Sequence, residues 1–255
     1  MAKQIESLRI VENKKLIKDL FTLELSGSGR IPEMKPGQFV QIKIDGCPGT
    51  FLRRPFSVHD VNYPQNTFKL LIQIAGKGSE ALSRLGNGDF LNLIYPLGNS
   101  FSMPEKGERI LLVGGGCGVA PLLFLGKHLK SNGFKPDILL GFRNSKRIIE
   151  LDEYSDLGKV FVTTEDGSRG KKGFVTEHPV LSSEGYDVIY CCGPEPMMKT
   201  VAKYCKVKRI KCEVSLENLM GCGFGVCLCC VVDTIKGNLC VCIDGPVFNI
   251  NDLKW

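Results

Sequence analysis

Residues 112–121 read Leu-Val-Gly-Gly-Gly-Cys-Gly-Val-Ala-Pro, and they join an apolar run to a stretch with helical spacing. The run that they complete, Arg109–Val113, is aliphatic like a buried strand, and Val119–Lys130 places apolar residues at helical intervals. Glycine tolerates the backbone angles of a tight turn. The stretch therefore predicts a strand–turn–helix unit whose backbone amides, at the start of the helix, can face an anion.

Further apolar runs follow this unit along the chain, at Ile138–Leu140, Val160–Val162 and Val188–Tyr190. Continuous apolar strands that alternate with helices indicate a parallel sheet covered on both faces. We therefore predict an α/β domain over residues 103–210. A second turn, Cys192–Pro194, follows the last of these strands. It should lie at the carboxyl edge of the sheet, where open α/β sheets bind ligands.

The two turns predict a nicotinamide dinucleotide site, although the first departs from the usual Gly-x-Gly-x-x-Gly fingerprint. Val119 stands at the third glycine position, and no acidic residue closes a second strand about 20 residues later. A tight turn without a ligand is the alternative. Thr163–Ser168 can line the same cleft, and Arg143 keeps NADPH open beside NADH. The candidate binding residues are Gly114, Gly115, Gly116, Gly118, Cys192, Gly193 and Pro194.

Residues 1–102 have a different texture, that of short strands bounded by Gly and Pro turns. Examples are Phe21–Leu25, Gln38–Ile44 and Phe68–Ile74. This pattern is typical of an antiparallel barrel or sandwich. One short helix is expected at Ser79–Leu85.

Two segments of this barrel-like region have phosphate-binding chemistry. In Arg53–Ser57, an arginine can grip a phosphate with two hydrogen bonds, and a serine can bond a phosphate or a ring edge. In Gly76–Ser79, successive backbone amides before a helix can cradle an anion. Each segment can equally be an ordinary turn.

The most specific pattern is made of cysteines. Seven of the twelve lie between Cys212 and Cys242, and the spacing Cys222-x4-Cys227-x2-Cys230, followed by Cys242, is that of plant-type [2Fe–2S] proteins. Zinc is the alternative, because it also accepts four thiolates, but structural zinc sites usually show two matched close pairs. Only one close pair is present here, so we predict a [2Fe–2S] cluster.

The cysteine-rich tail, residues 211–255, is too short for an apolar core of its own, so a metal centre is expected to replace that core. Cys229 and Cys240 lie beside the predicted ligands. We expect them to be small packing residues. A shifted register, in which one of them binds iron, stays open.

A nicotinamide site and an iron–sulfur site on one chain together imply a flavin. A nicotinamide delivers two electrons as a hydride, whereas a [2Fe–2S] cluster accepts one electron at a time. A group with a stable one-electron state must connect them, and a flavin has this property. The sequence therefore predicts a redox enzyme component.

Composition excludes several other classes of protein. No apolar run reaches the roughly 18–20 residues that cross a membrane, and the start of the chain lacks a secretory signal. A cytoplasmic protein is expected, in which a disulfide scaffold is disfavoured. The net charge of +6 comes from scattered basic pairs rather than a stripe, which argues against nucleic-acid binding.

The motifs together resemble the ferredoxin–NADP reductase superfamily. Arg54–Ser57 is similar to its flavin motif, and Gly114–Pro121 with Cys192–Pro194 to its nicotinamide motifs. The tail narrows the resemblance, because Ser215–Gly223 and Cys242–Phe248 look like the electron-transfer subunit of dihydroorotate dehydrogenase B. This resemblance covers essentially the whole chain, with the parts in the same order.

The resemblance implies a mixed β and α/β fold: an antiparallel FAD-binding β-barrel, a parallel-sheet nicotinamide-binding domain, and a small [2Fe–2S] domain. These would span residues 1–102, 103–210 and 211–255. It implies that FAD is bound by Arg54, Pro55, Phe56, Ser57, Leu71, Ile72, Gln73, Gly78 and Ser79, and the cluster by Cys222, Cys227, Cys230 and Cys242.

The function implied is electron transfer between NAD(H) and a separate FMN-containing catalytic subunit, through FAD and the cluster. That partner would oxidise dihydroorotate to orotate in pyrimidine biosynthesis, in a heterotetramer of two copies of each subunit. A reductase subunit of the NAD(P)H–ferredoxin or hydrogenase-associated type, feeding another acceptor, is the alternative.

Some residues stand outside these motifs. Position 56 holds Phe where an aliphatic residue is expected in many relatives, and Cys117 adds a thiol to the first glycine turn. His59, His128 and His178 show no ligand spacing, so we expect them at the surface or in loops.

Overall fold

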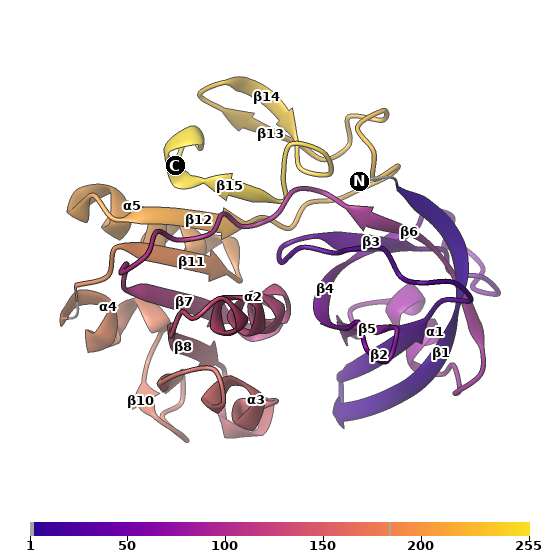
Figure 1. Ribbon diagram of the computed structural model, residues 1–255, viewed down its shortest axis with the longest axis horizontal. Helices are drawn as coiled ribbons and strands as arrows, with labels where there is room; N and C mark the ends of the chain where they lie inside the picture. Colours follow the sequence, from indigo (N-terminus) through magenta and orange to yellow (C-terminus); the bar gives the residue numbers. More distant parts are fainter. Residues whose placement is uncertain (1–2, 184) are drawn as a thin grey trace.

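The structure, a computed structural model, describes residues 3–183 and 185–255. A β-barrel forms one side of the molecule and an α/β domain the other, and the C-terminal segment lies across the top of both (Figure 1). This arrangement confirms the predicted fold class. No helix in the described part of the chain combines the length and apolar character needed to cross a bilayer.

Six strands close into the antiparallel barrel, in the order β1-β2-β5-β4-β3-β6. Inward side chains such as Leu23 and Leu70 are fully buried, as the alternation of a small barrel requires. Helix α1 (Lys77–Ser83) lies between β5 and β6 and begins two residues before the predicted helix. The strands are β1 (Gln4–Ile17), β2 (Leu20–Ser26), β3 (Phe39–Ile42), β4 (Arg54–Asn62), β5 (Thr67–Gln73) and β6 (Phe90–Leu97).

The α/β domain is built on a seven-stranded sheet in the order β10-β9-β8-β7-β11-β12-β15. Its neighbouring strands are parallel except at the β12–β15 edge, which is antiparallel. The predicted strand–turn–helix unit is present as β7, a short 3-10 helix η1 (Gly116–Val119) and α2. The strands are β7 (Ile110–Gly115), β8 (Asp137–Phe142), β9 (Val160–Thr164), β10 (Lys171–Lys172), β11 (Val188–Cys192), β12 (Lys211–Ser215) and β15 (Val247–Asn249).

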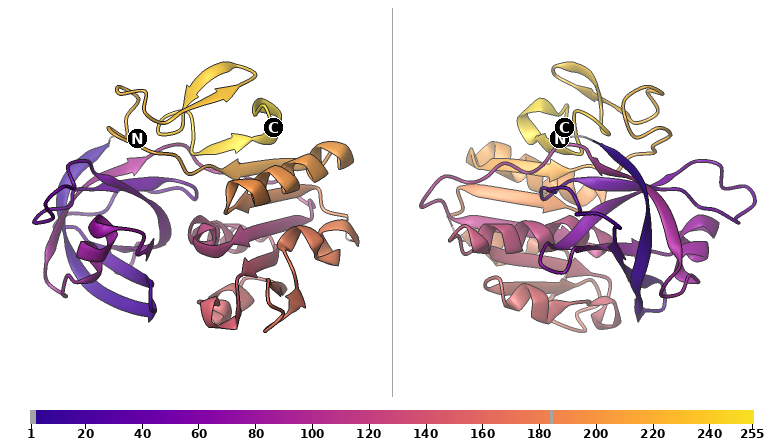
Figure 2. Two further views of the ribbon diagram at one scale, coloured as in Figure 1. Left: turned by 180° about the vertical axis from the view of Figure 1, so that it is seen from behind. Right: turned by 45° about the vertical axis from the view of Figure 1, so that its right-hand side comes forward.

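Helices cover both faces of this sheet, as the apolar strands predicted (Figure 2). The apolar residues of α2 and α3 join one buried cluster, and those of α4 and α5 join another on the opposite face. The helices are α2 (Ala120–Ser131), α3 (Leu151–Ser155), α4 (Pro179–Ser183) and α5 (Glu195–Lys208), with further 3-10 turns η2 (Ser145–Arg147), η3 (Val175–Glu177) and η4 (Ile250–Asp252).

The C-terminal segment forms a hairpin of β13 (Val231–Thr234) and β14 (Gly237–Cys240) and then returns to the main sheet as β15. β12 pairs with β11 on one side and with β15 on the other, so the sheet continues across the expected boundary at residue 210. Val241 and Phe248 are buried in the same cluster as Val214 of β12. The tail therefore buries its apolar residues against the α/β domain, and some of its cysteines are buried in the same cluster.

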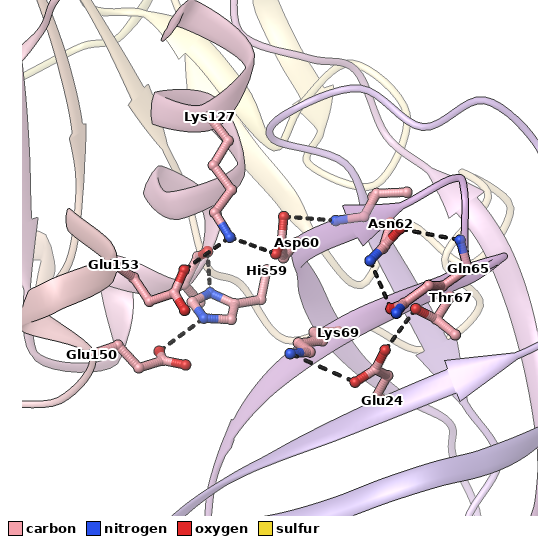
Figure 3. Close-up of polar contacts among 12 residues, drawn as sticks. Glu24, His59, Asp60, Asn62, Gln65, Thr67, Lys69, Lys127, Glu150 and Glu153 are labelled. Carbon is pink, nitrogen blue, oxygen red and sulfur yellow. Dashed lines mark hydrogen bonds and ion pairs between the residues drawn. The ribbon is translucent and has the colours of Figure 1, made fainter. Parts of the chain in front are cut away.

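A buried histidine connects the barrel to the α/β domain, and it contradicts the expectation that all three histidines are at the surface or in loops. His59 lies in β4 with its side chain fully enclosed (Figure 3). Its Nδ1 lies 2.7 Å from the carbonyl oxygen of Ala120, and its Nε2 lies 2.9 Å from Glu150 Oε2. The strand packs beneath α2, which the sequence spacing of histidines cannot reveal.

Glu150 has an unusual backbone as well as this buried partner. Its φ is +49°, a left-handed conformation that glycine or asparagine adopts at lower cost. Burial opposes ionisation of Glu150, but the hydrogen bond and charge of His59 outweigh it, so that the pKa of Glu150 is lowered.

A second interdomain contact lies beside it at the surface. Lys127 of α2 contacts Asp60 of β4 at 2.7 Å and Glu153 of α3 at 3.0 Å (Figure 3). The Glu153 side chain is 52% exposed, whereas that of Glu150 is 18% exposed. Because solvent screens exposed pairs, the two glutamates should differ in their effect on stability.

We predict that Glu150→Ala lowers the free energy of unfolding by about 2 kcal/mol, because the buried imidazole loses its charged partner. Glu153→Ala, the control, should cost only about 0.5 kcal/mol. Since the pKa of Glu150 is lowered in the folded state, its contribution is present above the unfolded pKa and disappears as pH falls through the folded pKa. Urea unfolding of the cofactor-loaded protein between pH 3 and 7 measures both effects. Equal losses in the two variants would contradict this interpretation.

Candidate functional site

A cavity of about 730 Å³ lies at the carboxyl edge of the α/β sheet, where the sheet faces the barrel. Leu20 and Gln73 line it from the barrel side. The opposite wall comes from the ends of β7, β8, β9 and β11 and from the start of α5. This is the edge at which open α/β sheets bind ligands.

The two predicted turns meet at this cavity, and they touch through glycines. A Cβ on Gly118 would lie 2.4 Å from the Gly193 Cα, so no larger residue fits while the turns stay together. Gly116 has a φ of +56°, and a Cβ there would meet nothing within 4 Å. The first turn therefore presents open backbone to the cavity, which suits a ligand that needs close approach to main-chain amides.

Not every predicted nicotinamide residue faces the cavity. Gly114 lies behind the turn, where a Cβ would crowd Val119 and Leu122, and Cys192 is buried in the sheet. Burial strongly raises the pKa of the Cys192 thiol. These two residues therefore hold the turns in place. The predicted residues that line the cavity are Gly115, Gly116, Gly118, Gly193 and Pro194.

The turn after β9 also reaches the cavity, as considered from the sequence. Thr163 and Glu165 line the wall, and Arg143 after β8 does so too. The hydroxyl oxygen of Thr163 is buried and has no hydrogen-bond partner among the described residues. A buried hydroxyl without a partner is costly unless a ligand satisfies it.

Arg147 at the end of η2 and Glu217 after β12 also line the cavity, although no role was predicted for either from the sequence. Burial raises the pKa of Glu217. The pKa of the Cys117 thiol is raised to about 12, mainly by burial and secondarily by the charge of Glu217. Cys117 is therefore a neutral thiol at physiological pH, with little nucleophilic character. Arg147 lies outside the motifs described above, and Glu217 lies within Ser215–Gly223 without a predicted role, because each reaches the cavity only through the tertiary fold.

The predicted FAD residues lie on β4, β5 and α1. The Arg53 guanidinium is bound to β6, because it donates to the carbonyl oxygen of Asn92 at 2.9 Å. Arg54 donates to the carbonyl oxygens of Leu52 at 3.1 Å and Arg53 at 3.4 Å, which are neutral acceptors. A Cβ on Gly78 would lie 3.8 Å from Arg54 Nε, which places this arginine beside the start of α1.

The other predicted FAD residues are half-buried or buried. Ser79 closes its own turn, because its hydroxyl oxygen accepts from the amides of Ala75 and Gly76 at 2.9 and 3.2 Å. Leu71 and Ile72 are buried between strands, whereas Gln73 reaches the cavity. Pro55, Phe56 and Ser57 are half-buried where β4 pairs with β3.

The predicted cluster ligands come together around one loop whose amides point at sulfur. Amide nitrogens of Cys222, Phe224 and Gly225 donate to Cys227 Sγ at 3.4 Å, Cys222 Sγ at 3.4 Å and Cys242 Sγ at 3.1 Å. Burial opposes ionisation of Cys222, but hydrogen bonds from the backbone amides of Phe224 and Cys227 and from the Cys227 thiol prevail and lower its pKa to about 6. Such a loop is arranged to stabilise thiolates, the form in which cysteine binds iron.

The four cysteines form two pairs rather than one tetrahedral set. Cys222 contacts Cys227 at the exposed loop, and Cys230 contacts Cys242 in the interior. Among the described residues, no three or more potential ligands converge as a single metal ion requires. Two thiolate pairs fit two irons, each with two sulfur ligands from the protein, better than one zinc ion. Cys240 also lies beside Cys230, and Cys229 is exposed.

Comparison with known proteins gives three family matches in the order of the three parts. An oxidoreductase FAD-binding domain matches residues 7–101, and an oxidoreductase NAD-binding domain matches residues 112–203. The iron–sulfur cluster binding domain of dihydroorotate dehydrogenase B matches residues 217–254. FAD-binding, NAD-binding and iron–sulfur domains are thus all present.

Curated relatives match over nearly their full length. The electron transfer subunit of dihydroorotate dehydrogenase B (NAD(+)) from Caldanaerobacter subterraneus subsp. tengcongensis is 40% identical, covering 94% of both chains. That of Clostridium perfringens is 39% identical over 98% of both.

Among solved structures, the NADH-dependent reduced ferredoxin–NADP oxidoreductase has a TM-score of 0.87 at 31% identity, covering 97% of this chain and 90% of that one. Phthalate dioxygenase reductase, with a TM-score of 0.64 at 20% identity, covers 78% of this chain and 63% of that one, and it shows a similar fold.

We predict that Cys227→Ser removes the iron–sulfur centre. The substitution removes one of the two thiolates of the Cys222–Cys227 pair, which would bind one of the two irons. Cys229→Ser is the matched control, two residues away and equally exposed, and it should keep the centre. Iron and acid-labile sulfide per chain, together with the visible spectrum, measure the outcome. A centre lost in Cys229→Ser and retained in Cys227→Ser would contradict the assignment.

Proposed function

The chain belongs to the family of dihydroorotate dehydrogenase B electron transfer subunits, and we propose that it carries electrons from dihydroorotate oxidation in a partner subunit to NAD⁺. Electrons pass between NAD(H) and the partner through FAD and the iron–sulfur centre. The observation that carries this proposal is that the barrel contacts both other sites, as a flavin between the two requires.

The contact of the barrel with the nucleotide cavity is made by the last residue of β5 and the first residue of β2. Gln73 and Leu20 line the cavity opposite the two glycine turns. A flavin held by the barrel would therefore lie beside a nicotinamide held by the α/β domain. Hydride transfer needs this proximity, because reacting atoms must approach to about 3–3.5 Å.

The contact of the barrel with the cysteine loop is made by Gln41 of β3. Its Nε2 lies 3.9 Å from the sulfur of Met220, and a Cβ on Gly223 would come within 2.8 Å of the same nitrogen. Gln41 is fully buried, and its Oε1 has no hydrogen-bond partner among the described residues. The loop and the barrel are thus in direct contact one residue away from the first predicted ligand.

We assign the cofactors to the residues expected from the sequence. FAD is assigned to Arg54–Ser57, Leu71–Gln73, Gly78 and Ser79, with Arg54 as the cation for its phosphates. NAD(H) is assigned to the glycine turns. The [2Fe–2S] cluster is assigned to Cys222, Cys227, Cys230 and Cys242, and the three parts to residues 1–102, 103–210 and 211–255.

The surface of the cysteine loop has the apolar character expected of a contact with a partner subunit. Phe224 is 43% exposed and Leu228 is 64% exposed, although both are large apolar residues. Leu228 also has a φ of +56°. Contiguous exposed apolar residues mark protein interaction sites. The other members of this patch are Leu219, Val226 and Ile243. We propose that it contacts an FMN-containing dihydroorotate dehydrogenase subunit in a heterotetramer of two copies of each.

A second function deserves a test because of one specific match. The NADH-dependent reduced ferredoxin–NADP oxidoreductase aligns with 97% of this chain at 31% identity. A subunit that feeds a ferredoxin-type acceptor would use the same three parts. The identity of the partner decides between the two functions.

We expect the purified chain alone to reduce its FAD with NADH and to form no orotate from dihydroorotate. Addition of the FMN-containing subunit should give orotate and NADH from dihydroorotate and NAD⁺. Absorbance at the orotate and NADH bands follows the reaction. Orotate formation by the chain alone, or a preference of the chain for a ferredoxin in a pull-down, would contradict the proposal.

The order of the relay has its own test. Cys227→Ser should abolish electron exchange with the partner and largely spare reduction of FAD by NADH, because the hydride step does not involve the loop. Stopped-flow bleaching of the flavin absorbance measures the second reaction. Loss of flavin reduction in a folded Cys227→Ser variant would show that the assumed order is wrong.

A further inference from the structure

An ion pair connects the barrel to the α/β domain at the nucleotide cavity. Asp19 lies in the turn between β1 and β2, and its carboxylate pairs with the Nη1 of Arg147 at the end of η2. Gln73 donates to the other carboxylate oxygen of Asp19 at 3.3 Å. Each charged side chain is 29% exposed, so that the pair is accessible to a solute in the cavity.

This pair lies close to the glycine turn that was predicted to face a phosphate. Arg147 lines the cavity together with Gly116 and Cys117 of that turn. The charges of both Arg147 and Asp19 act on the Cys117 thiol. An anion on the open amides of the turn would therefore lie within the field of the Arg147 guanidinium.

Arg147 is one of two arginines that the cavity offers to an anionic ligand. The lining of the cavity contains two arginines, Arg143 and Arg147, and three glutamates, Glu165, Glu195 and Glu217. A pyrophosphate approaching this wall meets more carboxylates than cations. Arginine is well suited to it, because its five N–H donors can bind phosphate oxygens in pairs.

The ion pair occupies the donors that such a ligand needs. Asp19 supplies the same chemistry as a phosphate, two oxygens sharing one negative charge, and it comes from the opposite wall. The Arg147 guanidinium lowers the pKa of the Asp19 carboxyl, so this aspartate stays charged at physiological pH. A phosphate and the Asp19 carboxylate would repel each other if both approached Arg147.

We propose that Arg147 binds the pyrophosphate of NAD(H) and that Asp19 competes with this ligand for it, so that nucleotide binding opens the Asp19–Arg147 contact between barrel and α/β domain. The inference rests on the proposed use of NAD(H) at this cavity. It assigns Asp19 the role of weakening nucleotide affinity. The opposite role, in which Asp19 orients Arg147 for the ligand, predicts the reverse sign in the experiment below.

The test measures calorimetric binding of ADP-ribose, which contains the pyrophosphate, and of adenosine, which lacks it, to the cofactor-loaded protein. Asp19→Asn should bind ADP-ribose about three- to tenfold more tightly, because the arginine is released while the side-chain shape is kept. Arg147→Gln should bind it at least about tenfold more weakly, and Arg147→Lys should recover part of the loss. Adenosine affinity should be unchanged in all three variants.

The double variant Asp19→Asn/Arg147→Gln separates competition from other effects. Once Arg147 is absent, removal of the Asp19 charge should change ADP-ribose affinity by less than about twofold if its influence passes through the arginine. Asp60→Asn is the matched control, because it breaks another ion pair between barrel and α2, away from the cavity. It should leave ADP-ribose affinity unchanged.

The outcomes distinguish this inference from the proposed function. If the wild-type protein bound no ADP-ribose, both would be overturned. If it bound ADP-ribose but Asp19→Asn weakened or did not change the affinity, only the competition would be wrong. Equal tightening in Asp60→Asn would also overturn it, because general loosening of the two domains would then explain the effect.

Discussion

The buried imidazole of His59 holds the barrel and the α/β domain in one orientation, and the site between them depends on that orientation. It connects three elements at once, because it lies in β4 and contacts the first residue of α2 and the residue before α3. Both neighbours offer acceptor oxygens, so its position is defined by direction as well as by packing. The cavity, which takes one wall from each domain, therefore has a defined shape.

The cysteine loop depends on the same arrangement from the other side. Its core residues are buried on the sheet, its Gly223 packs against Gln41 of the barrel, and Glu217 at its base lines the nucleotide cavity. A short segment thus contacts both domains before it reaches the surface. It exposes Val226 and Leu228 there, on either side of the exposed Cys227 in the sequence. Position in the fold, rather than any extra domain, allows the tail to connect the flavin to a partner.

Prediction from the sequence was most successful where a pattern is local. Aliphatic runs and glycine turns predicted the strands, the turn before α2 and the meeting of two turns at one edge, because backbone geometry depends on nearby residues. The same reasoning failed for His59, whose burial depends on how a helix from another domain lies on its strand. The pairing of β12 with β11 and β15, which continues the sheet across residue 210, also leaves no mark in a local pattern because these strands are distant in the sequence. Arg147 and Glu217 were missed for the same reason.

The sequence by itself determined the chemistry of this protein. Cysteine spacing selects the metal centre, glycine turns after apolar strands predict a dinucleotide site, and the difference between two-electron and one-electron carriers requires a flavin. The tertiary structure alone decided which residues face one another across the domain boundary: His59 with Glu150, Gln41 with the cysteine loop, and Asp19 with Arg147. Residues far apart in the chain acquire such contacts only when whole domains pack, since burial and charge pairing depend on distances that the order of residues does not encode locally.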